Sequence, residues 1–256
     1  MGRVGDSEIK IMPLFFAEEI KDNIAFLYED ADHLQKTLRL HVADAITVAD
    51  GHGFLYQCRI EATQKGCVQA RVLSCMQAAN EPTIDVTIYQ SICKGARFEV
   101  ATQKCTELGA KRMVPLHVKR CEMSARDMDK RRERLQKIAR EAAKQCGRAW
   151  IPTVEKTVTV EDVLAARHDL LLCPYEEERM RPLKSVLQAF GQARNIGIVI
   201  GPEGGFEPQE IEQLAQGGGQ IVTLGPRILR TETASPAVLS VVMYEFGQWD
   251  GGRACE

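Results

Sequence analysis

A glycine-rich loop that follows an apolar segment is the strongest local sign of chemistry in the chain. Residues 201–206 read Gly-Pro-Glu-Gly-Gly-Phe, between an expected strand at residues 196–200 and an expected helix at residues 208–216. Glycine permits positive φ and lets the backbone approach a ligand closely. The loop has neither the Lys-Ser/Thr step of a P-loop nor G-x-G-x-x-G spacing, so triphosphate and dinucleotide binding are weakly supported. A tight turn without a ligand is the alternative.

A second loop of similar character follows an expected strand at residues 220–224. Its residues are Gly225, Pro226, Arg227, Ile228, Leu229, Arg230, Thr231, Glu232 and Thr233. Thr231 and Thr233 are the two candidates for the N-cap of the helix that follows. The two arginines and the glutamate serve either a ligand or a structural ion pair, and the sequence leaves both open.

The two loops are expected to form one site. In a parallel sheet the ligand site lies at the carboxyl ends of the strands, and we expect consecutive strands to place their following loops side by side. A third loop, formed by Pro174, Tyr175 and Glu176, follows an expected strand at residues 170–173 and would complete the rim.

Charge is distributed unevenly along the chain. The 256 residues contain 33 Lys and Arg against 35 Asp and Glu, a formal net charge of −2. Thirteen of the basic residues but only five of the acidic ones fall between Lys111 and Arg148, most densely at residues 130–134. The net charge excludes a polycation, whereas a local excess of this kind is expected of a phosphate-binding face. A solvated helix face is the alternative.

Residues 1–80 predict a small β-barrel module. Expected strands at residues 45–49, 54–62 and 68–73 are separated by the turn signals Asp50-Gly51 and Lys65-Gly66. A helix expected at residues 33–40 would bring Lys36 and Arg39 together on one face. Asn80-Glu81-Pro82 is the expected linker.

Residues 81–256 alternate strands with helices and predict an α/β domain with a mostly parallel sheet. The expected strands are residues 84–89, 113–116, 170–173, 196–200 and 220–224. The expected helices are residues 96–108, 124–146, 183–190, 208–216 and 233–246. Ser124 is the expected start of the longest helix, and Gly109 and Gly147 are expected to end helices.

Composition and local patterns exclude several classes of protein. A hydrophobic content of 45% with 27% charged residues supports a folded core. The apolar stretches are far short of the roughly 20 residues of a membrane span, and residues 1–10 lack the apolar core of a secretory signal. The nine cysteines form no C-x-x-C pair, so we expect reduced cysteines, no metal site and a cytoplasmic protein. Met12 is a second candidate start, because a strand can begin at residues 13–16.

Several segments resemble one known family. Residues 201–206 and 224–234 look like the hallmark motifs of the RsmE-type 16S ribosomal RNA uracil-N3 methyltransferases, members of the SPOUT superfamily. Residues 103–109 resemble the helix-ending Glu-Leu-Gly segment of that family, residues 141–148 its next marker, and residues 33–40 its N-terminal His-Leu…Leu-Arg segment. The chain departs from the family pattern at Thr37, Ala43 and Ala96, all outside the cofactor loops.

The resemblance implies a PUA-like or OB-like barrel followed by a SPOUT domain with a C-terminal trefoil knot, S-adenosylmethionine as cofactor, and a homodimer. Sheet connectivity alone would not suggest a knot. The implied activity is methylation of N3 of a uridine, position 1498 of the reference 16S ribosomal RNA, in bare RNA or in the small ribosomal subunit. The alternatives are a SPOUT methyltransferase acting on a ribose or base of transfer RNA, and a non-catalytic RNA-binding ribosome assembly factor.

Carried over to this sequence, the resemblance implies three groups of site residues. The cofactor would be bound by Leu172, Cys173, Pro174, Ile200, Gly201, Pro202, Gly204, Gly205, Leu224, Gly225, Ile228 and Leu229. Glu232 and Glu203 are candidate general bases for the uracil N3 proton, and Arg230 is the candidate to stabilise the uracil anion. RNA would be bound by His33, Lys36 and Arg39 of the barrel and by Arg131, Arg132 and Arg148 of the basic face, with steep salt dependence.

Overall fold

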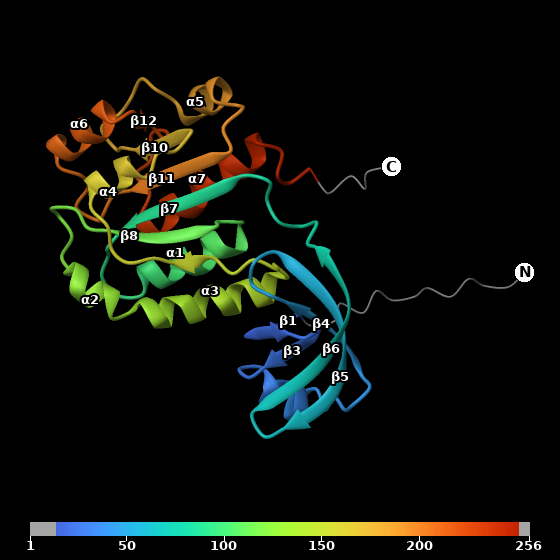
Figure 1. Cartoon of the computed structure of the whole chain (residues 1–256). Helices are drawn as coiled ribbons and strands as arrows, with labels where there is room; N and C mark the ends of the chain where they lie inside the picture. Colours follow the sequence, from blue (N-terminus) through green and yellow to red (C-terminus); the bar gives the residue numbers. More distant parts are fainter. Residues whose placement is uncertain (1–13, 251–256) are drawn as a thin grey trace, which may run out of the picture. The chain divides into compact units, whose positions relative to one another are not determined.

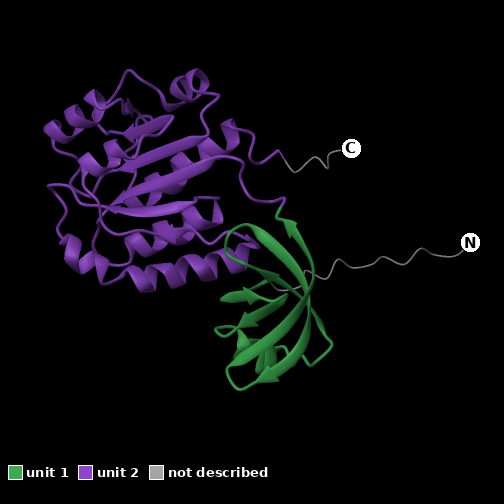
Figure 2. Ribbon diagram, viewed as in Figure 1, with its two compact units in different colours: residues 1–78 green, residues 79–256 purple. Residues whose placement is uncertain are grey.

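The chain folds as two units, Met1–Ala78 and Ala79–Glu256, in the computed structural model (Figure 2). The structure describes residues 14–250, so the second candidate start, Met12, lies outside the described residues. Each unit is built around its own hydrophobic residues.

A six-stranded sheet forms the first unit, in the order β1-β4-β5-β6-β3-β2 (Figure 1). Its strands are β1 (Leu14–Phe16), β2 (Glu19–Lys21), β3 (Ile24–Leu27), β4 (Ala45–Ala49), β5 (Phe54–Gln64) and β6 (Cys67–Gln77). The first and last strands of this order are separated in sequence only by Ala17 and Glu18. The amide of Ala17 donates to Ala49 O at 2.9 Å, and that of Glu18 donates to Phe26 O at 3.0 Å. The sheet therefore curls round into the predicted small barrel.

The barrel is filled by side chains that alternate inward along its strands, as expected for a period of two residues. Phe15, Leu27, Val48, Ile60 and Val68 are all buried there, together with Leu34 from the single helical turn η1 (His33–Thr37). The helix expected at residues 33–40 is too long, because Arg39 has a φ of 53° and lies beyond it. Lys36 and Arg39 therefore do not share a helical face.

The sequence did not predict the hairpin of β2 and β3. Its turn residues Asp22 and Asn23 have φ values of 51° and 60°. Asp and Asn tolerate this conformation better than other non-glycine residues, and two successive positive φ values match the twist of a two-residue hairpin. The pair Asp-Asn was therefore a usable signal.

Six parallel strands form the sheet of the second unit, in the order β12-β10-β11-β7-β8-β9. The strands are β7 (Asp85–Ser91), β8 (Arg112–Leu116), β9 (Thr153–Val154), β10 (Leu170–Pro174), β11 (Asn195–Ile200) and β12 (Gln220–Val222). The predicted parallel α/β domain is confirmed, and β9 is an addition to it. Because all strands run in one direction, their carboxyl ends lie along the same edge.

Helices cover both faces of this sheet (Figure 1). On one face, buried side chains of α1 (Arg97–Glu107), α3 (Arg132–Cys146), α5 (Leu183–Ala189) and α7 (Thr231–Glu245) pack with Ile88 and Ile198. On the other face, α4 (Val160–Ala165) and α6 (Pro208–Gln216) pack with Tyr89 and Val199. Burial on both faces explains why the strands read as continuous apolar runs.

The long helix expected at residues 124–146 is divided into α2 (Ala125–Asp129) and α3. Ser124 caps α2 as expected, accepting a hydrogen bond from the Asp127 amide, and Gly147 ends α3 with a φ of 76°. At the break, Asp129 accepts two hydrogen bonds from Thr157, at 2.8 and 2.9 Å, and Arg131 donates to Glu99 of α1. Asp129 and Arg131 thus bind different parts of the domain, at the point where α2 ends and α3 begins.

Candidate functional site

The three predicted loops meet at a cavity of about 630 Å³ at the carboxyl edge of the parallel sheet. Sequence reasoning predicted this convergence for the wrong reason. Strands β11 and β12 are not neighbours, because β10 lies between them. The loop that follows β10, with Pro174, Tyr175 and Glu176, therefore lies between the two glycine loops. It forms part of the cavity wall as expected of a third rim segment.

The glycine loop after β11 is a tight turn that is stabilised by contacts within the loop and with Arg120. The Gly205 amide donates to Pro202 O at 3.0 Å, and Gly205 has a φ of 69°. A Cβ at this position would also collide with the Glu176 carboxylate. Phe206 is buried and its ring lies 3.0 Å from the position of a Cβ on Gly201. Arg120 braces the loop by donating to Gly204 O at 2.9 Å. A side chain at Gly201 or Gly205 would therefore not fit without movement of Phe206 or Glu176.

The loop after β12 leaves the sheet at Val222 and runs exposed along the cavity. Gly225 has a φ of 98° and donates its amide to the Thr223 hydroxyl at 3.2 Å. Ile228 is 84% exposed, an unusual state for a large apolar side chain. Leu224 and Leu229 are partly buried against the core and anchor the loop on either side.

Thr231 connects the two glycine loops. Its hydroxyl donates to Gly201 O at 2.7 Å and accepts a hydrogen bond from the side-chain amide of Gln90, also at 2.7 Å. Thr231 and Gln90 are both buried. The N-cap of α7 is Arg230, so the prediction that Thr231 or Thr233 caps this helix is wrong. The Thr231 side chain is instead used to join α7 to β7 and to the loop after β11.

Two carboxylates and one arginine lie at the mouth of the cavity. Arg97 Nη1 donates to Glu203 Oε1 at 2.5 Å, and Arg97 Nε lies 3.8 Å from Glu232 Oε1. The Lys94 amide also donates to Glu203 Oε1, at 3.3 Å. Glu232 Oε2 is buried and has no hydrogen-bond partner among the described residues. Both candidate bases turn Oε1 toward Arg97 and leave Oε2 without a hydrogen bond among the described residues, but only the Oε2 of Glu232 is buried.

The arginines of the second loop are exposed and uncommitted. Neither Arg227 nor Arg230 has a side-chain hydrogen bond or ion pair within residues 14–250, and both line the cavity. The alternative that these arginines form a structural ion pair with Glu232 is not supported, because the cation beside Glu232 is Arg97. Arg97 itself was missed. It follows the carboxyl end of β7. The other loops were selected because they follow the carboxyl ends of expected strands, and the same criterion could have found Arg97.

Most of the predicted cofactor residues line the cavity. They are Pro174, Ile200, Gly201, Pro202, Gly204, Gly205, Leu224, Gly225, Ile228 and Leu229, with Glu203, Arg230 and Glu232 beside them. Leu172 and Cys173 are exceptions, because neither lines the cavity, and their contact with the cofactor stays a prediction. Both are fully buried inside β10, Leu172 in the core under α1, α3, α5 and α7 and Cys173 in the core under α4 and α6. Successive strand side chains point to opposite faces, so each of the two is packed into the core on its own side of the sheet.

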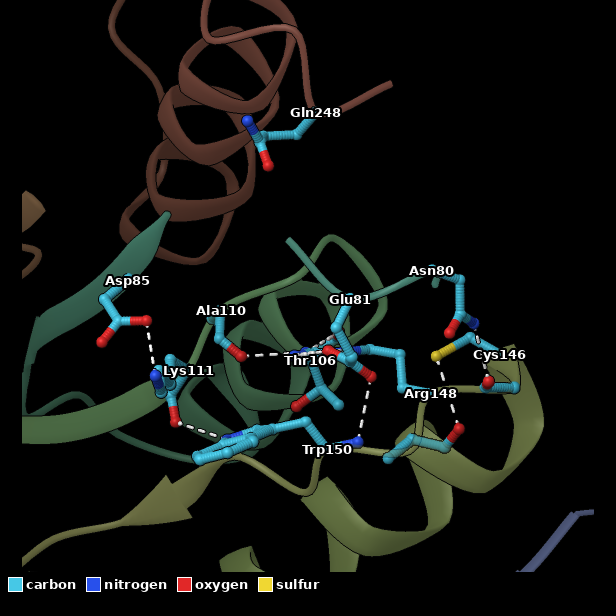
Figure 3. Close-up of polar contacts among 12 residues, drawn as sticks. Asn80, Glu81, Asp85, Thr106, Ala110, Lys111, Cys146, Arg148, Trp150 and Gln248 are labelled. Carbon is cyan, nitrogen blue, oxygen red and sulfur yellow. Dashed lines mark hydrogen bonds and ion pairs between the residues drawn. The ribbon is translucent and has the colours of Figure 1, made fainter. Parts of the chain in front are cut away.

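Arg148 is a structural residue, and the prediction that it contacts RNA is wrong. Its Nη1 donates to Thr106 O and Ala110 O, both at 2.8 Å, while its Nη2 donates to Glu81 Oε2 at 2.8 Å (Figure 3). The Arg148 side chain is only 7% exposed. Glu81, expected in a linker, is thereby fixed to the second unit, and Asn80 is fixed to it by a hydrogen bond to Gly147 O.

The remaining predicted RNA residues differ in exposure. Arg131 lies against α1, donating to Gly95 O at 2.9 Å and to Glu99 at 2.7 Å, so it holds that helix in place. Arg132 is exposed on α3. In the first unit His33, Lys36 and Arg39 are exposed, and Lys36 forms an exposed ion pair with Asp32 at 2.8 Å. Contact of these five residues with RNA stays a prediction.

Comparisons with known proteins agree with this architecture. A family described as the RNA methyltransferase domain matches residues 79–243, and the RNA methyltransferase PUA domain matches residues 29–73. Ribosomal RNA small subunit methyltransferase E of Bacillus subtilis is 32% identical over 85% of this chain and 88% of its own. The enzyme of that name from Mycobacterium bovis is 31% identical over 95% of this chain and 96% of its own.

A solved structure is similar over nearly the whole fold. Ribosomal RNA small subunit methyltransferase E from Neisseria gonorrhoeae, bound to S-adenosylmethionine, has a TM-score of 0.79 and 31% identity over 91% of this chain and 97% of that one. Fold and site thus define an RNA methyltransferase of the SPOUT type with an N-terminal PUA domain. More specifically, the chain belongs to the family of ribosomal RNA small subunit methyltransferase E.

Two further properties concern the described residues as a whole. No cluster of three or more His, Cys, Asp or Glu between residues 14 and 250 could hold a metal ion. In the same part of the chain, no helix has the length and apolar content needed to cross a membrane.

Proposed function

We propose that this protein transfers a methyl group from S-adenosylmethionine to N3 of a uridine in 16S ribosomal RNA, at the position that corresponds to uridine 1498. Family membership supports ribosomal RNA as the substrate. The observation that supports N3 chemistry is the Glu232 carboxylate, which has a buried Oε2 without a hydrogen-bond partner among the described residues and belongs to a residue that lines the cavity together with Arg230.

The cavity fits S-adenosylmethionine. Its volume of about 630 Å³ is in the range of small-molecule sites. Backbone groups of residues 201–205 and 224–229 are exposed to it, and the glycines remove the side chains that would fill it. Relatives from Neisseria gonorrhoeae and Legionella pneumophila were crystallised with this cofactor. Pro174, the glycine loops, Leu224 and Leu229 are the residues that would hold it.

The reaction divides between positioning and proton removal. Bound S-adenosylmethionine supplies an activated methyl group, so the protein must orient the acceptor and free its electron pair. Uracil N3 carries a proton, and the Glu232 carboxylate would take it as the N3–H bond breaks. The electron pair left on N3 then accepts the methyl group. Arg230 would stabilise the negative charge that develops on the uracil ring during this step.

The oligomeric state and the cellular location that we propose are those implied by the family resemblance. Val241 and Tyr244 of α7 are 42% and 68% exposed, and such apolar side chains would be covered in the homodimer that we propose. A C-terminal trefoil knot and a cytoplasmic location are further parts of the proposal. Sedimentation equilibrium of the purified protein tests the dimer directly.

Mapping the methylated nucleotide tests the function. Small-subunit RNA from a strain that lacks the protein would be digested and compared by mass spectrometry with RNA from the parent strain. We expect one N3-methyluridine to disappear and to return when purified protein and S-adenosylmethionine are added. A lost modification in transfer RNA would point instead to the alternative SPOUT activity, and unchanged RNA together with no cofactor binding in calorimetry would indicate a non-catalytic assembly factor.

A second test concerns the residue roles. We expect Glu232→Gln and Arg230→Ala each to slow single-turnover methylation by about a hundredfold at saturating RNA and cofactor, the usual contribution of such groups. Unchanged single-turnover rates would remove both residues from the mechanism.

A further inference from the structure

Arg97 is the cation shared by the two carboxylates of the site. It projects from the first turn of α1, and its guanidinium reaches Glu203 of the loop after β11 at 2.5 Å and Glu232 of α7 at 3.8 Å. One planar guanidinium thus joins two segments that are far apart in sequence. Arginine suits this role because its donors form a rigid fork, whereas lysine presents a single point charge.

The start of α1, which carries Arg97, is held in place by α3 and by the residue just before it, Arg131. Glu99, two residues further along α1, accepts Arg131 Nη2 at 2.7 Å and Arg134 Nη2 at 2.9 Å. Arg131 also donates to Gly95 O, in the turn that precedes α1. The Glu99 side chain is only 14% exposed, so this is a sheltered network and not a loose surface pair. The start of α1 is therefore held in place, and Arg97 with it.

The two carboxylates differ in their hydrogen-bond partners and in their exposure. Glu203 Oε1 accepts from both Arg97 and the Lys94 amide. Glu232 turns Oε1 toward Arg97 and leaves Oε2 buried without a partner within residues 14–250. The Glu232 side chain is 18% exposed against 38% for Glu203. Glu232 thus depends more strongly on Arg97 for its charge, since a buried carboxylate without a cation is costly.

The other charged and titratable groups around this cluster are few. From the segment after β7, the Cys93 thiol lies close enough to interact electrostatically with Glu203 and Glu232, and with Arg97 and Arg131 in the opposite sense. Burial, reinforced by the two carboxylates, raises the pKa of Cys93 to about 12, so this thiol stays neutral near physiological pH. Lys94 turns its ammonium to Glu122. Arg230 lines the same cavity but forms no ion pair with either carboxylate within residues 14–250. Arg97 is therefore the cation in contact with both Glu203 and Glu232.

We propose that Arg97 is a positioning residue for methyl transfer, which balances the charges of Glu232 and Glu203 and holds the Glu232 carboxylate at the wall of the cavity, where the uracil N3–H would be presented. This inference rests on the proposed function, since it assumes that Glu232 accepts the N3 proton. Without Arg97, two like charges would face each other at the mouth of the cavity. One of them would then hold a proton more readily, and Glu232, being more buried, is the one affected.

The experiment measures single-turnover methylation against pH for the full-length protein and three variants, with small-subunit RNA and S-adenosylmethionine at saturation. In Arg97→Gln we expect the acidic limb of the pH–rate profile to move up by about one pH unit, the usual effect of losing an opposite charge at this range. On the acidic limb the rate at a given pH should fall by about tenfold, because one pH unit there is a factor of ten, whereas the rate at neutral pH should change little.

Two variants separate charge from shape. Arg97→Lys keeps the positive charge, so its acidic limb should return most of the way to the wild-type position even if its maximal rate is lower. The double variant Arg97→Gln with Glu203→Gln removes the like charge, so its limb should also move back. A purely structural Arg97 would lower the rate without moving the limb, and Glu203→Gln would not correct the loss.

Binding and folding are measured in parallel. Calorimetric titration with S-adenosylmethionine should give similar affinities, within about threefold or 0.6 kcal/mol, for wild type and all variants, and their thermal unfolding should remain cooperative. An unmoved acidic limb in Arg97→Gln would overturn the inference while the wild-type protein still forms N3-methyluridine. If the wild type forms none, the proposed function fails instead. A wild-type rate in Glu232→Gln would also contradict the inference, because it would remove the base that Arg97 is proposed to position.

Discussion

Arg148 and Glu81 form a sheltered ion pair in which Nε and Nη2 of Arg148 both donate to Glu81 Oε2, at 3.1 and 2.8 Å. The other carboxylate oxygen, Oε1, accepts the Trp150 amide at 2.9 Å. Arg148 comes from the turn after α3 and Glu81 from the segment before β7, so the pair ties the start of the second unit to its interior. Arg148 donates four hydrogen bonds in all, when those to the carbonyls of Thr106 and Ala110 are included.

Arg148→Met should therefore reduce stability strongly. Removing one partner of a buried pair typically costs about 3–5 kcal/mol, because the other charge is left unbalanced. Urea unfolding of the variant measures the loss. Arg132→Met, on the exposed side of α3, is the matched control and should change stability by no more than about 0.5 kcal/mol. Equal losses in the two variants would contradict the structural role of Arg148.

The case of Arg148 shows where sequence reasoning reaches its limit. A run of Lys and Arg identifies a basic segment, but it does not say which members are turned inward. Arg148 directly follows Gly147, the residue that ends α3, and this was a sign that it leaves the helical surface. Its partner Glu81 is distant in sequence, so no local pattern could pair the two residues. Arg132, in the middle of the run, is exposed as the pattern suggests.

The fold was easier to predict than its connections. Buried strands such as β10 and β11 and the helix α6 were recognised because apolar runs and periodicity are local properties. The order of the strands was not, and β11 and β12 were wrongly taken as neighbours. For the site, the glycine loops were found from their composition. Arg97 was not, although its place after the carboxyl end of β7 made it a candidate. Its role depends on Glu203 and Glu232 from other segments, and no local pattern pairs it with them.

Gly205→Ala should weaken cofactor binding without a large loss of stability. Alanine at a φ of 69° is strained, and its Cβ would displace Glu176 from the cavity wall. Moving Glu176 changes the wall of the cavity that would hold the cofactor, so we expect about tenfold weaker binding of S-adenosylmethionine, about 1.4 kcal/mol, by calorimetry. Gly66→Ala is the control, since Gly66 has a φ of 76° but open space around it, in the β5–β6 turn. It should lose similar stability and retain cofactor affinity; weaker binding in both variants would point to a general folding defect.

Arg132→Gln should lower the salt dependence of RNA binding. If Arg132 contacts a phosphate, its removal reduces the slope of log affinity against log salt by about 1. Fluorescence anisotropy with a labelled fragment of small-subunit RNA at several salt concentrations measures the slope. Glu133→Gln changes the neighbouring exposed residue in the opposite sense of charge and should leave affinity equal or higher. The same slope in wild type and Arg132→Gln would exclude a phosphate contact by this residue.

His168 should make the stability of the protein fall as the solution is acidified. Its two ring nitrogens lie 2.9 Å from the Tyr89 hydroxyl and from Asn195 Oδ1. Burial lowers the pKa of His168, and the hydrogen bond with Asn195 offsets this only in part. A lowered pKa means that the unfolded chain binds the proton more readily.

The stabilising contribution of neutral His168 is therefore complete above the ordinary histidine pKa of about 6.5 and is lost as the pH falls through the lower pKa of the folded protein. Urea unfolding between about pH 8 and about pH 5 should show this decline, and His168→Gln should flatten it because glutamine does not titrate. His117→Gln, which alters an exposed histidine, is the control and should keep the wild-type slope. If His168→Gln is as sensitive to acid as the wild type in this range, another group controls the acid response.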